Sequence, residues 1–334
     1  MDGTRYSLRE FRETDYGALA AIQNAVEPDE PVSAESLRHM IQSFQDSSRP
    51  RHLVVEDRRS GEVVGTGSIF MMPFESDPAK QWIVGSVLPS RQREGIGSCL
   101  YDTLLSEAKR REAIGLQCRV RENSVSGRTF VTKRGFRERR RVWRSCLDVA
   151  SADTSPLASL VRTLTAEGIE LTTLSREGVN DPEVLQRLHD LDVVTGKDEP
   201  REGIYTPISL DQYRRFFFEG ENFLPNSWFL AKVGSQYVGV SSGAREPAQP
   251  QVLQQHFTGV RPEFRRRKIA QALKMMLIDF ARQNGYARIE TSNDSVNVPM
   301  WSLNQGLGFQ KVHEVIQFEC DLGDATKGEA PAGP

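Results

Sequence analysis

Residues 87–97 read Val-Leu-Pro-Ser-Arg-Gln-Arg-Glu-Gly-Ile-Gly and lead directly into the stretch SCLYDTLLSEAKR at 98–110. In the second stretch apolar residues recur every three or four positions, which predicts an amphipathic helix. A strand that passes through a proline and a glycine-bearing turn into a helix leaves backbone N–H groups unpaired at the turn and at the helix start. Glycine also lets the chain approach a pyrophosphate closely. The segment is therefore a candidate anion-binding turn, although a single copy is more often ordinary turn chemistry.

The same pattern returns 173 residues later. Residues 260–270 read Val-Arg-Pro-Glu-Phe-Arg-Arg-Arg-Lys-Ile-Ala and precede QALKMMLIDFARQ. The same offset links Gly135-Phe136 to Gly308-Phe309, without a gap. Self-similarity at one fixed offset indicates a duplicated domain.

The length of 334 residues agrees with two domains at roughly 150 residues each. We expect an N-terminal domain over 1–150, a linker helix over 151–167, a C-terminal domain over 168–322 and a disordered tail over 323–334. Each half reads as a strand, two helices, three strands, the turn with its helix, a further strand, a short helix and a final hairpin.

The composition excludes several classes of protein. A net charge of −2 argues against broad nucleic-acid binding, and the basic run Arg265–Lys268 has no interleaved aromatic residues. No apolar stretch is long enough for a membrane span, and residues 1–15 lack the pattern of a signal peptide. The four cysteines are isolated, which argues against a disulfide framework or a metal site. We expect a cytoplasmic protein, as a monomer or a homodimer, without nucleic-acid or membrane partners.

Further motifs narrow the prediction. In the first half they are Val87-x-Pro89-x-x-Gln92-x-x-Gly95-x-Gly97 and Lys133-x-Gly135-Phe136; in the second they are Thr258-Gly-Val260-x-Pro262-x-x-Arg265-x-x-Lys268-x-Ala270, Thr291-x-Asn293, Asn297-x-x-Met300 and Asn304-x-x-Leu307-Gly308-Phe309. Together these motifs resemble two Gcn5-related N-acetyltransferase (GNAT) domains in tandem. The resemblance covers residues 4–148 and 168–322.

The resemblance implies an α/β fold whose mixed sheet opens between its fourth and fifth strands, with acetyl-CoA in that opening. Its pantetheine arm would pair with the backbone of residues 86–88 or 258–260, and its pyrophosphate would lie on the turn at 92–98 or 265–271. An unidentified primary amine would attack the thioester directly, without a metal. The implied cofactor-binding residues are Val87, Gln92, Arg93, Glu94, Gly95, Ile96, Gly97, Ser98, Thr258, Val260, Arg265, Arg266, Arg267, Lys268, Ala270 and Asn297.

The catalytic groups are less clear. Many family members place a tyrosine four residues before the late glycine as the acid that protonates the thiolate, but this chain has Val131 and Asn304 there. Asn304 retains a hydrogen-bond donor. His256 alternates with Thr258 and Val260 along the expected fourth strand, and an ordinary pKa of about 6.5 suits a general base. A surface or packed histidine is the alternative for His256.

The two halves thus differ. The first has the better phosphate turn, while the second has more polar groups but carries Lys268 where glycine is wanted. We therefore expect an acetyltransferase with at least one working site. One alternative is a CoA-binding regulatory or scaffold protein, and another is a two-domain enzyme whose first half is a structural remnant. Asp198, Glu199 and Glu202 either attract a cationic acceptor or belong to a solvated loop.

Overall fold

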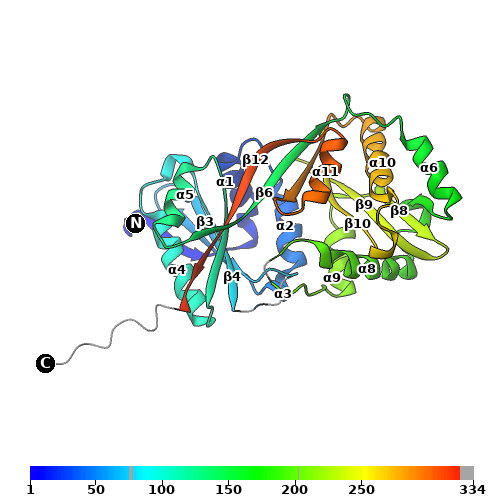
Figure 1. The fold of residues 1–334 in the computed structure, drawn as a ribbon. Coiled ribbons are helices and arrows are strands. Elements are labelled where there is room, and N and C mark those ends of the chain that lie inside the picture. The colour runs from blue at the N-terminus through cyan, green and yellow to red at the C-terminus, as the bar shows by residue number, and fades with distance from the viewer. Residues whose placement is uncertain (75–76, 78, 202, 324–334) are drawn as a thin grey trace. The chain divides into compact units, whose positions relative to one another are not determined.

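The structure is a computed structural model that describes residues 1–74, 77, 79–201 and 203–323 (Figure 1). Glu202 and residues 324–334 of the predicted tail lie outside this set. The chain forms two compact units. Unit 1 contains Met1–Leu37, Phe44–Arg141 and the chain from Val315 onward, and unit 2 contains Arg38–Ser43 and Val142–Glu314.

The first half of the chain supplies most of unit 1. Its elements are β1 (Tyr6–Glu10), α1 (Tyr16–Val26), α2 (Ala34–Ser43), α3 (Gln45–Ser48), β2 (Arg51–Asp57), β3 (Glu62–Phe70), β4 (Lys80–Val87), α4 (Ile96–Arg110), β5 (Gly115–Arg121), α5 (Val125–Thr132) and β6 (Arg137–Asp148). The sheet order in this unit is β1-β2-β3-β4-β5-β12, and β4 runs parallel to β5. The predicted strands and helices up to α5 are confirmed.

Unit 2 repeats the arrangement. Its elements are α6 (Leu157–Ala166), β7 (Glu170–Thr173), α7 (Leu174–Glu177), α8 (Pro182–Thr195), α9 (Leu210–Phe218), β8 (Phe223–Val233), β9 (Gln236–Arg245), β10 (Val252–Val260), α10 (Ile269–Gln283), β11 (Arg288–Asp294), α11 (Val298–Gly306) and β12 (Gln310–Asp321). The sheet order is β6-β11-β10-β9-β8-β7, with β10 parallel to β11. The helix α6 lies within the segment 151–167 that is expected to link the two halves, and the predicted capping box of Ser209 and Gln212 begins α9.

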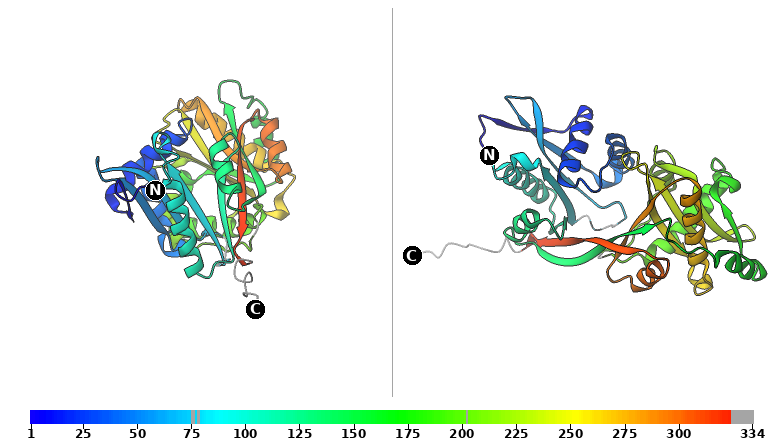
Figure 2. Two further views of the ribbon diagram at one scale, coloured as in Figure 1. Left: turned by 90° about the vertical axis from the view of Figure 1, so that its left-hand side faces the viewer. Right: turned by 90° about the horizontal axis from the view of Figure 1, so that it is seen from above.

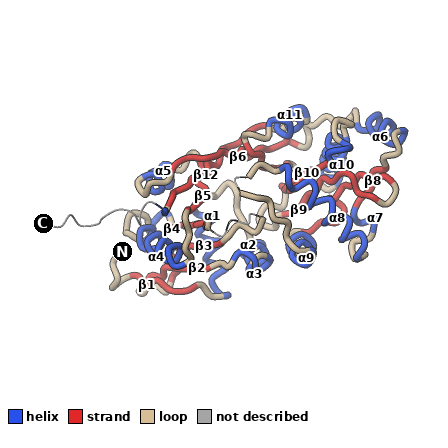
Figure 3. Tube along the Cα trace, turned by 60° about the horizontal axis from the view of Figure 1, so that its bottom comes forward, coloured by secondary structure: helices blue, strands red, loops and turns tan. Residues whose placement is uncertain are grey.

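In each unit one long helix lies against the sheet, α4 on β3 and β4 and α10 on β8 and β9 (Figures 2 and 3). Glycine allows the close approach at the start of each helix. A β-carbon added at Gly65 would lie 2.8 Å from Ile96, and one added at Gly239 would lie 2.9 Å from Ile269. These contacts fix the first turn of each helix beside the sheet.

The predicted final hairpins are wrong. Each half ends instead in one twelve-residue strand, β6 or β12, which passes from one unit into the other. The end of β12 pairs with β5 in unit 1 (Val315 opposite Arg121), and the end of β6 pairs with β11 in unit 2 (Arg288 opposite Asp148). Ile316 and Phe318 accordingly belong to the core of unit 1, whereas Leu147 belongs to the core of unit 2. Pairing between residues distant in sequence decides this exchange, and local patterning does not report it.

All four cysteines are free. Among the described residues, no helix combines the length and the apolar character that a membrane crossing requires.

Candidate functional site

The two predicted phosphate turns have the same backbone conformation. In unit 1 the short helix Pro89–Arg91 leads into a bend with positive φ at Arg93 (69°) and Gly95 (81°). In unit 2 the short helix Pro262–Phe264 leads into a bend with positive φ at Arg266 and Lys268, both 62°. These positions are related by the 173-residue offset of the sequence repeat. Lys268 therefore adopts the left-handed conformation of the glycine it replaces, and the bend is retained.

Each bend leads into a helix whose first turn has no capping side chain. Neither Gly95 nor Lys268 provides a capping hydrogen bond to α4 or α10. The predicted ligands Ile96, Gly97 and Ser98 lie in the first turn of α4, and Ala270 lies in that of α10. Because the amide groups of a first helical turn have no partner inside the helix, these two turns can accept an anion.

Four other helices contrast with these two, whereas α1 and α6 also begin without a capping side chain. Side chains cap α5, α8, α9 and α11, from Ser124, Asp181, Ser209 and Asn297. Asn297, a predicted cofactor ligand, accepts a hydrogen bond from the Met300 N–H at 3.3 Å. Its side-chain oxygen thus serves the start of α11 in this structure.

The first side chain of each turn ties the bend to the preceding strand. Gln92 Nε2 donates to the carbonyl oxygen of Val87 at 3.3 Å, and Arg265 Nε donates to that of Val260 at 3.1 Å. Equivalent side chains thus make equivalent bonds in the two units. Gln92 and Arg265 accordingly position the turn, whatever else they bind.

Acidic and terminal residues cover parts of both turns. Glu94 accepts hydrogen bonds from Arg5 and from the Tyr6 hydroxyl, and the main chain of Met1 lies against Gly95. In unit 2, Arg265 pairs with Asp198, and Arg267 lies 3.7 Å from Glu167.

The other two basic residues of the second turn are exposed. Among the described residues, Arg266 and Lys268 make no ion pair. Two of the four basic residues predicted to bind phosphate, Arg265 and Arg267, therefore already have carboxylate partners, and the other two do not. Two of the acidic residues considered as binding sites for a cationic acceptor also form ion pairs within the protein. Glu199 pairs with Arg201, and Asp198 pairs with Arg265.

Each sheet opens where the cofactor was expected. β4 pairs with β5 only over Lys80–Trp82, although both strands continue beyond that point. β10 likewise pairs with β11 only over Val252–Gln254. Past these residues the facing backbone groups of the two strands no longer bond each other, which confirms the predicted opening in both units and leaves sites for an extended ligand.

The two openings differ in one residue. Along β10 the partner of Gln255 is Gly243 and the partner of Thr258 is Ser241, so His256 and Phe257 together lie opposite Ser242. This is a β-bulge. β4 pairs with β3 in unbroken register from Trp82 to Val87. The expected alternation of His256 with Thr258 is therefore wrong, because the extra residue between Gln255 and Thr258 places these two side chains in contact with each other instead.

Side chains from neighbouring strands hold the bulge. Thr258 Oγ1 lies 2.9 Å from Ser241 Oγ and accepts a bond from Gln255 Nε2 at 2.8 Å. Thr291 on β11 donates to the Gln255 carbonyl at 3.1 Å. Sequence reasoning missed the roles of Gln255 and Ser241. The bulge is visible in the strand bounds of the structure: the strand starts Lys80 and Val252 differ by 172 positions, while the strand ends Val87 and Val260 differ by 173.

His256 lies within the bulge, and its side chain retains solvent exposure. Desolvation lowers the pKa of His256 below its ordinary value of about 6.5, and repulsion from Arg144 is a smaller cause. The imidazole is therefore a weaker base than the sequence alone implied. Arg144 is held in place by Gln254 at 2.6 Å and Glu290 at 3.1 Å.

Asn304, on α11, is fully buried. Its Nδ2 donates to Asn293 Oδ1 on β11 at 2.6 Å, and its own Oδ1 has no partner among the described residues. The bond holds α11 against β11. In unit 1 the equivalent position is Val131, a buried core residue.

Comparison with known proteins agrees with this geometry. The family model described as "Acetyltransferase (GNAT) family" matches residues 13–136 and 195–309. The chain belongs to the GNAT acetyltransferase family. Membership indicates acyl transfer from an acyl-CoA, and the two matched segments correspond to the two halves of the GNAT repeat.

Solved structures resemble the tandem GNAT fold over almost its full length. A GCN5-related N-acetyltransferase from Sphaerobacter thermophilus is 18% identical with a TM-score of 0.67, and the match covers 95% of this chain and 96% of that one. A tandem GNAT protein from the clavulanic acid biosynthesis pathway is 16% identical with a TM-score of 0.72, covering 95% and 98%. No curated protein matches this GNAT chain. At these identities the likeness extends to the fold alone.

Proposed function

We propose that this chain transfers an acetyl group from acetyl-CoA to a primary amine of a small molecule or peptide, and that the chemistry takes place in unit 2. The bulge at His256–Phe257 carries the proposal. A bulge removes backbone groups from the sheet ladder at one point. An N–H group freed beside the opening is suited to stabilise the oxyanion that forms when an amine attacks a thioester.

The reaction requires few side chains. The free amine attacks the carbonyl carbon, the carbon–sulfur bond breaks, and CoA leaves as a thiolate while the amine proton passes to His256 or to water. A thiol with a pKa near 8.5 is a good leaving group, so the absent tyrosine does not prevent turnover. Much of the acceleration of such a transfer comes from positioning of the two reactants.

The turn geometry supports cofactor binding in unit 2 despite Lys268. Its backbone bend matches that of unit 1, and the exposed Arg266 and Lys268 add positive charge. The side-chain amide of Asn304 has two N–H hydrogens, and one of them is donated to Asn293. In this scheme only the other hydrogen is left to donate to the departing thiolate. We regard His256 as the stronger catalytic candidate.

Unit 1 favours the second candidate function, cofactor binding without chemistry. β4 has no bulge, Val131 offers no polar group, and Glu94 and Met1 lie on the phosphate turn. We propose that unit 1 serves as a CoA-binding or purely structural partner of the catalytic unit.

Thiol release from acetyl-CoA across a panel of primary amines tests the proposal. Gly97→Glu and Ala270→Glu form a matched pair, because both introduce a carboxylate at the second residue of the helix that follows a turn. We expect Ala270→Glu to abolish turnover and Gly97→Glu to retain it. Clear CoA binding without thiol release from any amine would favour the regulatory reading, and loss of turnover in Gly97→Glu alone would assign the chemistry to unit 1.

A further inference from the structure

Unit 1 has an arginine without an ion pair beside its phosphate turn. Arg134 follows α5 and donates through Nη2 to Ser98 Oγ, in the first turn of α4, at 2.9 Å. Its Nη1 donates to the Phe130 carbonyl at 3.1 Å, and its guanidinium lies 3.6 Å from the Phe130 ring centroid and 4.9 Å from that of Tyr101. Among the described residues Arg134 has no carboxylate partner.

This location is unfavourable for a cation unless an anion is bound nearby. The start of a helix carries partial positive charge, which repels a guanidinium. A phosphate on the first turn of α4 would reverse the sign of that interaction. The aromatic rings keep the guanidinium in place without neutralising it.

Unit 2 supplies a cation at the corresponding place from a different residue. With the 173-residue offset, Arg134 corresponds to Leu307 and Tyr101 corresponds to Lys274. Tyr101 packs on Phe136 with ring centroids 6.3 Å apart, and the Lys274 ammonium lies 5.4 Å from the ring centroid of Phe309, the counterpart of Phe136. Unit 2 thus has Leu307 in place of Arg134, and it has the cation Lys274 in place of Tyr101, the ring that the Arg134 guanidinium contacts in unit 1.

Lys274 is buried, with 2% of its surface exposed, and it makes no ion pair in the described part of the chain. Burial alone lowers its pKa to about 7. Long side chains on a helix extend toward the helix N-terminus, which for Lys274 is the direction of the phosphate turn. A buried lysine without a counter-ion is costly, and a bound phosphate would supply one.

We propose that Arg134 in unit 1 and Lys274 in unit 2 are equivalent phosphate-binding cations, each of which pairs with a phosphate of CoA held on its turn. The inference rests on the proposed cofactor binding and adds to it two ligands outside the turn motif. The CoA phosphate is either the pyrophosphate or the 3′-phosphate, which share this chemistry.

The experiment isolates one turn at a time in the full chain. Ala270→Glu leaves the turn of unit 1 as the parent site, and Gly97→Glu leaves that of unit 2. CoA and 3′-dephospho-CoA are titrated calorimetrically into each parent, then into Arg134→Leu in the first background and Lys274→Met in the second. We expect each substitution to weaken CoA binding roughly tenfold to a hundredfold. Equal losses for both ligands would assign the pyrophosphate, and a loss for CoA only would assign the 3′-phosphate.

A transplant separates binding from folding. Arg134→Leu together with Tyr101→Lys gives unit 1 the arrangement of unit 2, and we expect it to regain the affinity lost in Arg134→Leu. Arg137→Leu removes an exposed positive charge three residues away and should leave affinity unchanged. Unaltered affinity in Arg134→Leu and Lys274→Met, or failure of the transplant to restore binding, would overturn the inference. A Gly97→Glu parent that binds no CoA would instead refute the proposed function. An Ala270→Glu parent that binds none would make unit 1 a purely structural partner and would overturn the part of the inference that concerns Arg134.

Discussion

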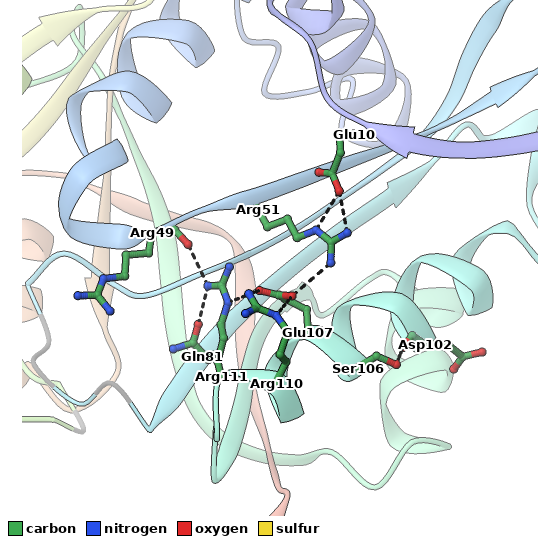
Figure 4. Close-up of polar contacts among 9 residues, drawn as sticks. All are labelled: Glu10, Arg49, Arg51, Gln81, Asp102, Ser106, Glu107, Arg110 and Arg111. Carbon is green, nitrogen blue, oxygen red and sulfur yellow. Dashed lines mark hydrogen bonds and ion pairs between the residues drawn. The ribbon is translucent and has the colours of Figure 1, made fainter.

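Glu107, near the end of α4, is a buried carboxylate held by three arginines (Figure 4). It bonds Arg110 at 2.6 Å, Arg111 at 2.8 Å and Arg51 at 3.2 Å. Hydrogen bonding from Arg110, followed by Arg111, outweighs burial and lowers the Glu107 pKa to about 2. Unit 2 has Phe280 at the equivalent position, packed against Phe229. The ion cluster is thus a support particular to unit 1 and lies outside the phosphate turn.

Glu107→Gln should lower the free energy of unfolding by about 2 kcal/mol at pH 7, because the three guanidinium groups lose their shared partner. The carboxylate has a lower pKa folded than unfolded. Its stabilisation is therefore complete above the ordinary pKa of 4.5 and disappears as the pH falls toward 2. Urea unfolding at pH 7 and pH 3 measures both effects, with the exposed Glu62→Gln as control. An equal difference from the parent at the two pH values would contradict this account.

Lys268 lies in the left-handed region of backbone conformation at the second phosphate turn, which lowers the stability of the fold. A side chain in the left-handed region costs about 1 kcal/mol relative to glycine. Lys268→Gly should therefore raise the free energy of unfolding by about that amount. Lys268→Ala is the matched control, since it removes the charge but keeps the β-carbon, and it should leave stability near that of the parent. If the alanine variant gained as much as the glycine variant, charge repulsion among the basic residues would be the cause instead.

Two variants at the bulge in β10 distinguish a catalytic role of the backbone from one of the His256 side chain. Deletion of His256 would give β10 the continuous register of β4, whereas His256→Ala keeps the bulge and removes only the imidazole. If the freed backbone group stabilises the oxyanion, we expect the deletion to lower kcat by at least a hundredfold and the alanine variant to lower it less. Thiol release at saturating acetyl-CoA measures both. A larger loss in His256→Ala than in the deletion would assign the main role to the side chain.

These elements also show how far the sequence can predict the site. The turn was predictable because its proline, its small residues and its helix pattern are all local, and the repeat doubled the signal. The bulge was missed because one extra residue in a nine-residue strand changes the register without changing the composition. Asn297 stays a predicted cofactor ligand, and its bond to Met300 adds a role as the N-cap of α11, which the sequence also allows for an asparagine before a helix.

The exchange of the last strands decides which core each residue stabilises. Phe318, late in the second half, packs in the core of unit 1 with Leu116 and Cys118, while Leu147, late in the first half, packs in the core of unit 2 with Ile289. Their side chains are buried, with 4% and 0% exposed. Removing either should therefore destabilise the unit built mainly from the other half of the sequence.

Phe318→Ala and Leu147→Ala test this crossed dependence, each with an expected loss of roughly 3 kcal/mol from the cavity it leaves. Native-state hydrogen exchange reads the two units separately. Phe318→Ala should speed exchange in β3 and β4 and spare β9 and β10, and Leu147→Ala should do the reverse. If each substitution instead loosened the strands of its own sequence half, the last strands would pair within their own halves, as the hairpins expected from the sequence do. The crossed result would mean that neither half of the sequence completes its sheet alone, so the unit proposed to carry the chemistry depends on a strand from the half proposed to lack it.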